Sequence, residues 1–384
     1  MKLSRSIPIS LLLAARNLFR DRIRLITTLI GIIFSVVLVT VELGLFMGFE
    51  RTVTMMIDHA RADIWIGPAQ TKSFEAAWFL KGRERFQALP VEGVTDVSPV
   101  MVGFNYWRKP DGSSLVPVFL VGIEPESDAL QPWNIVAGTL ADLESPDAVA
   151  VDETYFDRLG VTGVGDQAEL GDRKARVAAV TKGIRSFATT PYVFAPIDRV
   201  RASMAAPPGA ATYFLVRVTP GADVEAIRRR LSADLPDADV LTSDEFRSRS
   251  RSYWLFETGA GAALLASALL ALIVGTVIVG QTLYASTKDH VGEFATLRAI
   301  GSRRGYIYRV ILSQALLSGI IGFAIAAAAG GTLARLSTES ALPVVMTPSL
   351  VVALFVLTLL MCSVSAISAI LVVMRIDPVE AFAR

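Results

Sequence analysis

Four long apolar segments divide this sequence, and each is long enough to cross a lipid bilayer. They lie at residues 25–49, 255–284, 307–334 and 350–374. A helix needs about 20 predominantly apolar residues to span the hydrocarbon core of a membrane. The hydrophobic fraction of 52% is also above that of an ordinary soluble domain. We therefore expect a membrane α-helical protein with four transmembrane helices.

The positive charges of the connecting segments predict the orientation of these helices. Lys and Arg are frequent in residues 1–24, in residues 285–306 and in the tail at residues 375–384, whereas residues 336–349 contain neither. Basic residues favour the cytoplasmic side of a membrane. Both termini are therefore predicted to be cytoplasmic. The large segment at residues 50–254 and the short loop at residues 335–349 are predicted to lie outside.

Residues 1–24 are expected to form an amphipathic helix on the cytoplasmic surface. Arg16, Arg20 and Arg24 recur at a spacing of four, opposite a leucine-rich face. An Arg-rich amphipathic helix is suited to the lipid headgroup layer.

The outer segment, residues 50–254, is large enough for its own core and reads as a mixed α+β domain. Residues 97–109 and 114–123 alternate like the strands of a hairpin, as do residues 167–170 and 175–180. Residues 211–218, 222–233 and 239–242 predict a strand, a helix and a returning strand. The fold class is therefore a four-helix membrane protein with a large α+β domain between its first and second spans.

Small residues recur every four positions in two of the spans. In the second span they are Gly259, Ala263, Ser267, Ala271 and Gly275. In the third span they are Ser318, Gly322, Ala326 and Gly330. Such ridges let helix backbones approach closely in a membrane. Packing within one subunit and packing between two copies both remain open from spacing alone.

One ionisable side chain, Glu42, falls inside the first span. A carboxyl at membrane depth is a functional candidate by default. The alternative is that Glu42 reaches the outer interface.

Motifs for catalysis and for metal or nucleotide binding are missing from the sequence. The net charge of +1 argues against nucleic-acid binding. The single cysteine, Cys362, and the distant His59 and His290 suggest neither disulfides nor a metal site. Residues 301–305 lack the Lys-Ser/Thr ending of a phosphate-binding loop. We expect no cofactor in this chain and no enzymatic activity of its own.

Apolar side chains just beyond the first span suggest a second hypothesis. Met55, Met56, Phe74, Trp78 and Phe79 could line a cleft for an amphiphile. Photo-crosslinking of labelled lipid from Phe74 and Trp78 would test this.

The charged segment at residues 288–301 lies between the second and third spans. Val291, Phe294 and Leu297 form a short apolar stripe, and Gly301 follows as a C-cap. An isolated helix of this length is unstable in water, so it must dock on another surface.

This segment carries a resemblance to a known family. Its run EFATLRAIG, residues 293–301, resembles the coupling helix of the FtsX/MacB-like, or mechanotransmission, ABC permeases. The opening LAARNLFRDRIRL and the tail MRIDPVEA also resemble that family. The resemblance implies that Phe294 and Leu297 dock on a separate ATPase subunit, with Glu293 and Arg298 at the rim and Gly301 closing the helix.

The resemblance also implies partners and a location. ATP and Mg²⁺ would bind the partner ATPase, and the permease would form a homodimer in the bacterial inner membrane through its first and second spans. The outer domain would have two lobes, the middle one at about residues 94–210. A separate permease of this size, with the ADIWI run just beyond the first span, is most similar to the DevC group, whose members work with a separate ATPase, a periplasmic membrane-fusion protein and an outer-membrane duct.

Three functions remain open within this resemblance. The first is export of a lipid-like or hydrophobic substrate through such a tripartite system. The second is lateral extraction of haem or lipid from the membrane, as in the HrtB type. The third is regulation of cell-wall hydrolases, as in FtsX.

Overall fold

The computed structural model describes residues 16, 18–20, 22–75, 78–186, 190–289, 304–340 and 343–373. It divides into two compact units. Of the described residues, those within 1–47, 263–338 and 344–384 form the membrane unit, and those within 48–262 and 339–343 form the periplasmic unit.

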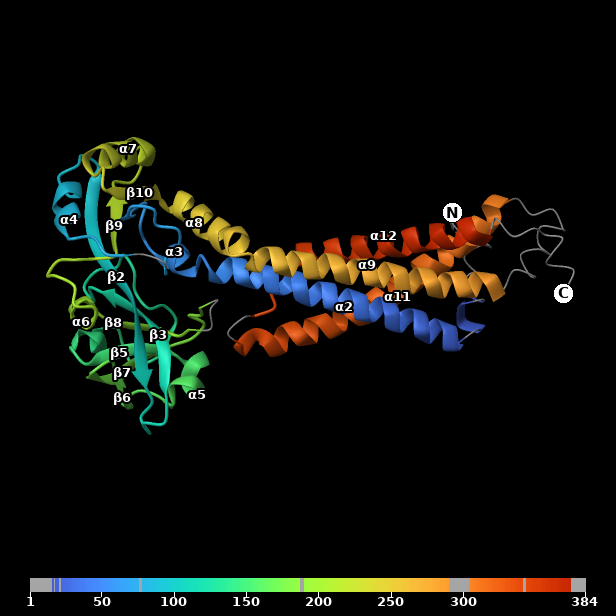
Figure 1. Cartoon of the computed structure of the whole chain (residues 1–384), viewed down its shortest axis with the longest axis horizontal. Helices are drawn as coiled ribbons and strands as arrows, with labels where there is room; N and C mark the ends of the chain where they lie inside the picture. Colours follow the sequence, from blue (N-terminus) through green and yellow to red (C-terminus); the bar gives the residue numbers. More distant parts are fainter. Residues whose placement is uncertain are drawn as a thin grey trace, which may run out of the picture. The chain divides into compact units, whose positions relative to one another are not determined.

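The membrane unit is built from four long apolar helices that pack side by side (Figure 1). They are α2 (Arg22–Thr52), α9 (Ala260–Asp289), α11 (Arg304–Leu336) and α12 (Pro348–Val373). A short 3-10 helix, η4 (Ser337–Glu339), follows α11. All four long helices contain a segment that is long and apolar enough to cross a membrane. The predicted four-span architecture is confirmed.

The start of the second span differs from the prediction. Residues 253–257 form a π-helix, η3 (Tyr253–Glu257), and the apolar helix α9 begins only at Ala260. Gly259 separates the two with a φ of +79°. A left-handed residue cannot continue a right-handed helix, so the span predicted from residue 255 begins at Ala260.

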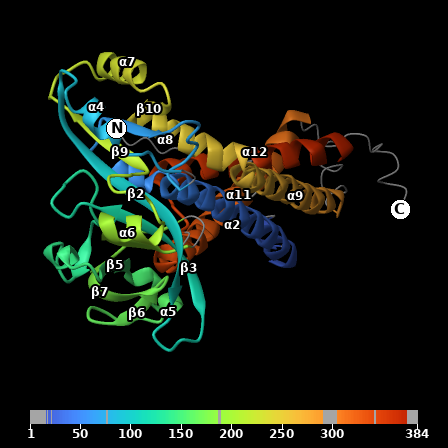
Figure 2. The same cartoon turned by 60° about the vertical axis from the view of Figure 1, so that its left-hand side comes forward.

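The periplasmic unit contains one mixed sheet of ten strands, seen from two sides in Figures 1 and 2. Its strands are β1 (Ile64–Pro68), β2 (Val94–Arg108), β3 (Leu115–Ile123), β4 (Ile135–Ala137), β5 (Ala148–Asp152), β6 (Gln167–Leu170), β7 (Arg173–Thr181), β8 (Tyr192–Pro196), β9 (Tyr213–Val218) and β10 (Ala238–Thr242). The order along the sheet is β10-β1-β9-β2-β3-β8-β5-β7-β4, with β6 beside β2 and β7. The predicted α+β class of this domain is confirmed.

Short helices connect and cover these strands. They are α3 (Met55–His59), α4 (Arg83–Ala88), η1 (Ala141–Glu144), η2 (Glu153–Tyr155), α5 (Phe156–Leu159), α6 (Ile197–Ser203), α7 (Val224–Asp234) and α8 (Ser243–Ser252). Helix α7 is capped by Asp223, whose carboxylate accepts hydrogen bonds from two backbone amides at the start of the helix. Helix α8 begins with a capping box between Thr242 and Glu245. Both starts are therefore encoded locally.

The two predicted hairpins and the strand–helix–strand return are present. Strand β2 pairs with β3, and β6 pairs with β7, both antiparallel. Strands β9 and β10 flank β1, and each is antiparallel to it. Helix α7 connects β9 to β10, and β1 lies between these two strands in the sheet. Strand β1 follows the first span in the chain.

Strand β2 joins the two halves of the sheet. Its first part pairs with β9 and its second part with β3. One core cluster lies between β1, β9, β10 and α7, and another lies under β3, β5, β7 and β8. A third cluster draws residues from both halves. The division into two lobes at residues 94–210 stays a prediction.

Candidate functional site

The predicted coupling residues lie outside the described residues. Glu293, Phe294, Leu297, Arg298 and Gly301 fall in the gap between α9 and α11. Their role in docking an ATPase stays a prediction. The same holds for most of the amphipathic segment at residues 1–24 and for the tail at residues 375–384.

Two of the predicted packing residues of α9 contact α2 of the same chain. The Ser35 hydroxyl donates a hydrogen bond to the carbonyl oxygen of Ala271, with an O···O distance of 3.0 Å. A Cβ added at Gly275 would lie 1.9 Å from the Oγ of Ser35. Ala271 and Gly275 therefore let α2 and α9 approach closely within one subunit.

The other three predicted packing residues behave differently. Ala263 and Ser267 are exposed in the single chain and stay candidates for contact with a second copy. Gly259 precedes α9 and has a positive φ, so its assignment to the helical ridge was wrong. The exposed face of α9 also carries four apolar side chains: Leu265, Leu269, Ile273 and Val277.

The ridge of α11 also packs within the subunit. A Cβ added at Gly322 would lie 2.5 Å from Ile32, and one at Gly330 would lie 3.0 Å from Thr40. Ile32 and Thr40 both belong to α2. Helix α2 is therefore contacted through small residues by both α9 and α11, which favours the single-subunit alternative for this ridge.

Glu42 is half-buried in α2. Among the described residues, no hydrogen bond or ion pair to its carboxyl is found. Two residues further on, the carbonyl oxygen of Gly44 accepts a hydrogen bond from the amide of Val345, at 3.0 Å. A Cβ at Gly44 would lie 2.4 Å from the side chain of Val344, so a larger residue there would displace Val344. The functional role of Glu42 stays a prediction.

Two stalk segments join the periplasmic unit to the spans along the chain. We define the first stalk segment as residues 48–61 and the second as residues 243–259. The Ser250 hydroxyl donates to the carbonyl oxygen of Val53 at 3.1 Å, and Arg251 pairs with Glu50 at 3.1 Å. Arg247 of α8 pairs with Asp58 of α3. The two stalk segments are therefore tied to each other at three levels.

The second stalk segment is also held by the loop that follows β1. Trp254 donates its indole N–H to one carboxyl oxygen of Glu75 at 3.3 Å, and Tyr192 of β8 donates its hydroxyl to the other at 2.6 Å. Lys72 pairs with Glu257 at 2.6 Å. Its ammonium also lies 5.3 Å from the ring centroid of Tyr253. Glu75 thus connects the π-helix to the sheet.

Burial raises the pKa of the Glu75 carboxyl above its ordinary value of 4.5. A carboxyl with a higher pKa in the folded protein binds more protons when folded, so its contribution to stability falls as the pH rises above about 4.5. Glutamine cannot titrate. We therefore expect the free energy of unfolding of E75Q to rise relative to that of the native chain as the pH increases above about 4.5.

Denaturation at several pH values, followed by tryptophan fluorescence, measures this difference. The same substitution at the exposed Glu92 is the control. Parallel pH profiles for E75Q and the native chain would contradict the prediction.

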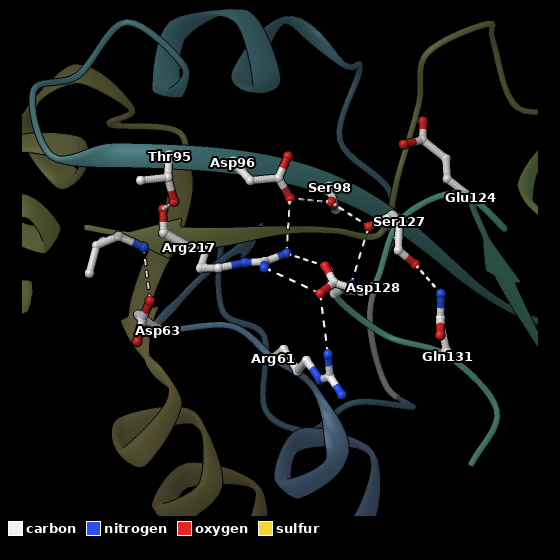
Figure 3. A network of polar contacts seen from close by, with 12 residues as sticks. Arg61, Asp63, Thr95, Asp96, Ser98, Glu124, Ser127, Asp128, Gln131 and Arg217 are labelled. Carbon is white, nitrogen blue, oxygen red and sulfur yellow. Dashed lines mark hydrogen bonds and ion pairs between the residues drawn. The ribbon is translucent and has the colours of Figure 1, made fainter. Parts of the chain in front are cut away.

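The first stalk segment is attached to a different loop, shown in Figure 3. Arg61 and Arg217 both donate to the carboxylate of Asp128, and Arg217 lies 3.7 Å from Asp96. Hydrogen bonding from Arg217 lowers the pKa of Asp128. The Arg61 amide donates to the carbonyl oxygen of Ala129 at 2.7 Å.

Next to this network, the His59 ring stacks on Trp133 at a centroid distance of 3.8 Å. An open cavity of about 440 Å³ is lined by residues 60–63, 217–222 and 224. The guanidinium groups of Arg61 and Arg217 are both paired with the carboxylate of Asp128. The network therefore joins the first stalk segment to the loop at residues 124–133. Sequence reasoning missed this network and the Glu75 bridge.

The proposed amphiphile cleft beyond the first span is not supported. Met56 and Phe74 are 2% and 1% exposed and belong to the core. Phe74 stacks on Tyr213 and lies edge-on to Trp65. Phe79 packs against a second core cluster, whereas Trp78 is 83% exposed. Within the described residues, no group of three metal-ligating side chains converges.

The geometry therefore defines a class of membrane protein: four spans, with a large α+β unit inserted between the first and second and tied to them by stalk segments. Comparison with known families agrees with this class. Residues 25–234 match the model of the MacB-like periplasmic core domain, and residues 265–378 match that of the FtsX-like permease C-terminal region. The chain belongs to the FtsX/MacB-like family of ABC transporter permeases.

Individual curated relatives share less than a third of their aligned residues with this chain. The macrolide export ATP-binding/permease protein MacB of Shewanella sp. (strain W3-18-1) is 22% identical, over 94% of this chain and 58% of that protein. MacB of Agrobacterium fabrum (strain C58) is 27% identical, over 62% of this chain and 38% of that protein. The chain thus spans less than two thirds of these curated relatives.

Solved structures are similar to part of this chain at low identity. The periplasmic region of MacB from Actinobacillus actinomycetemcomitans covers 49% of this chain and 92% of its own, with 14% identity and a TM-score of 0.39. The extracellular domain of the transporter YknZ from Gram-positive bacteria covers 47% of this chain and 98% of its own, with 14% identity and a TM-score of 0.34.

Proposed function

We propose that this chain is the permease subunit of an ABC transporter and that a separate ATPase subunit drives it from the cytoplasm. Membership of the permease family supports this proposal most directly. The segment at residues 293–301 would dock on the ATPase and pass its opening and closing to the spans. The chain itself would catalyse no reaction.

Movement of the spans would reach the periplasmic unit through the stalk segments. The supporting observation is that each stalk segment is bonded to a different loop of that unit, through Asp128 on one side and Glu75 on the other. A relative displacement of the two spans would then act on both loops at once.

The substrate class we favour is lipid-like or hydrophobic. We place the chain in the bacterial inner membrane with both termini in the cytoplasm, as a homodimer in a tripartite exporter with a fusion protein and an outer-membrane duct. Lateral extraction of haem or lipid and regulation of a cell-wall hydrolase are the alternatives.

Substitution of the coupling segment tests the proposal. F294D should weaken co-purification with the ATPase on the order of tenfold or more, because a charge would replace an apolar anchor. Adding L297D should uncouple ATP hydrolysis from transport while the periplasmic unit stays folded. T296D, two residues away on the other face of the predicted helix, is the matched control.

Native co-purification followed by mass spectrometry separates the alternatives. An ATPase recovered with a periplasmic fusion protein supports the tripartite exporter, whereas a cell-wall hydrolase supports the regulator. Haem absorbance in the purified protein would favour lateral extraction of haem. Unchanged transport by the F294D/L297D variant would contradict the coupling role.

A further inference from the structure

A row of aromatic rings crosses three neighbouring strands of the periplasmic sheet. Phe104 of β2 lies directly opposite Phe119 of β3, and their ring centroids are 5.8 Å apart. Tyr106 lies 5.5 Å from Phe104 on one side, and Tyr192 of β8 lies 5.8 Å from Phe119 on the other. We call these four residues the aromatic stripe.

The outer part of the aromatic stripe is uncovered. Phe104 is 52% exposed and Tyr106 is 50% exposed, and Leu115 on the same face is 53% exposed. The opposite face of the same two strands is buried, because Trp107 and Val118 are 0% exposed in the core. Strands β2 and β3 therefore cover a core with one face and present apolar rings on the other. Contiguous exposed apolar surface of this kind marks a binding surface.

The inner end of the aromatic stripe is linked to the second stalk segment. Tyr192 donates its hydroxyl to Glu75, and Glu75 also accepts the indole N–H of Trp254. Trp254 lies six residues before Ala260, the first residue of the second span. Tryptophan is enriched at the membrane–water interface. Two hydrogen bonds through Glu75 thus link the inner end of the aromatic stripe to the second stalk segment, which leads along the chain into the second span.

The stalk segments and the aromatic stripe share one core. Met56 of the first stalk segment and Phe246 of the second belong to the cluster that contains Tyr192, and Phe119 packs against that cluster. The exposed rings therefore extend the surface on which the stalk segments dock.

We propose that the aromatic stripe binds the acyl chain of an amphiphile taken from the outer leaflet of the membrane. This inference rests on the proposed function and gives it a site. The rings supply apolar contact along a line, with successive ring centroids 5.5 to 5.8 Å apart, over which a single extended acyl chain would lie. The charged side chain at the outer end, Arg108, is paired with Glu169 at 2.9 Å, so the stripe itself favours the tail of an amphiphile over its headgroup.

Photo-labelling of the full-length chain in nanodiscs tests this site. The probe is a lysophosphatidylethanolamine with a photoreactive diazirine in its acyl chain, and labelled peptides are identified by mass spectrometry. We expect the label on β2 and β3. The F104S/Y106S variant should reduce the labelling of β2 and β3 roughly tenfold. Binding of an acyl chain would bury the exposed halves of the two aromatic side chains, and serine at these positions removes that apolar contact.

The matched control is F86S on α4, where Phe86 is 76% exposed outside the aromatic stripe. F86S should leave the label on β2 and β3 unchanged. An equal label on α4, or a label that F104S/Y106S does not reduce, would overturn the proposal. If F104S/Y106S instead turns a dimer into a monomer at constant labelling, the surface is an interface between two copies.

The labelling needs no ATP and no partner, so it is independent of coupling. The F294D/L297D variant should retain the label while losing transport. Loss of the label with intact coupling would therefore remove the acyl-chain site and leave the proposed permease function in place.

Discussion

Replacing Gly275 with valine is expected to destabilise the membrane unit by about 3 kcal/mol or more, because added volume cannot be accommodated in a tightly packed contact. The new Cβ would lie 1.9 Å from the Oγ and 2.4 Å from the Cβ of Ser35. Helices α2 and α9 would have to separate, and the hydrogen bond from Ser35 to Ala271 would be lost with them.

The loss should appear as a lower melting temperature of the full-length chain in detergent and as a smaller monodisperse fraction in size-exclusion chromatography. Gly331 of α11 is a matched control, because a Cβ there meets nothing within 4 Å. The smaller substitution G275A should also lower the melting temperature. S35G should partly restore it, because glycine lacks the Oγ and Cβ atoms of Ser35 that the new Cβ would meet. Equal melting temperatures for G275V and G331V would show that α2 and α9 are not in close contact.

Replacing Gly138 with alanine is expected to destabilise the periplasmic unit by about 4 kcal/mol, the sum of backbone strain and a main-chain clash. Gly138 follows β4 and has a φ of +74°. A Cβ there would lie 2.1 Å from the carbonyl oxygen of Ala178 in β7. Because the obstacle is backbone in a paired strand, no side-chain rotation can relieve it.

Substitution of Gly183 distinguishes the cost of backbone strain from the cost of the main-chain clash. Its φ is +91°, but a Cβ there meets nothing within 4 Å. G183A should therefore cost only about 1–2 kcal/mol, the strain of a left-handed alanine. Denaturation followed by tryptophan fluorescence reports on this unit alone, because all five tryptophans lie between residues 65 and 254. Similar losses for G138A and G183A would mean that β4 moves away from β7 at little cost.

The sequence predicted the features that depend on local pattern. Four apolar runs gave the four spans, and period-two alternation gave the hairpin of β2 and β3. The second span was started too early because Leu255 and Phe256 are apolar like the helix that follows. Hydropathy does not distinguish a π-helix such as η3 from a continuous span, and Gly259 looked like part of a small-residue ridge.

Contacts between distant residues could not be read from the sequence. Tyr192 and Glu75 are 117 positions apart, and nothing in either local pattern indicates that they meet. A spacing of four predicted close helix contact at Ala271 and Gly275 but not the partner, which is α2 of the same chain. Composition likewise suggested Phe74 as a cleft residue, whereas the exposed rings are Phe104 and Tyr106.

The separate attachment of the two stalk segments has a mechanical consequence. A displacement that carries both segments together leaves the spacing between the 71–75 loop and the 124–133 loop unchanged. A slip of one segment past the other changes that spacing, after first breaking the contacts of Ser250, Arg251 and Arg247. The periplasmic unit would thus respond only when one stalk segment moves relative to the other, and not when both move together. The force needed to start this relative movement would be set by the three polar contacts between the segments.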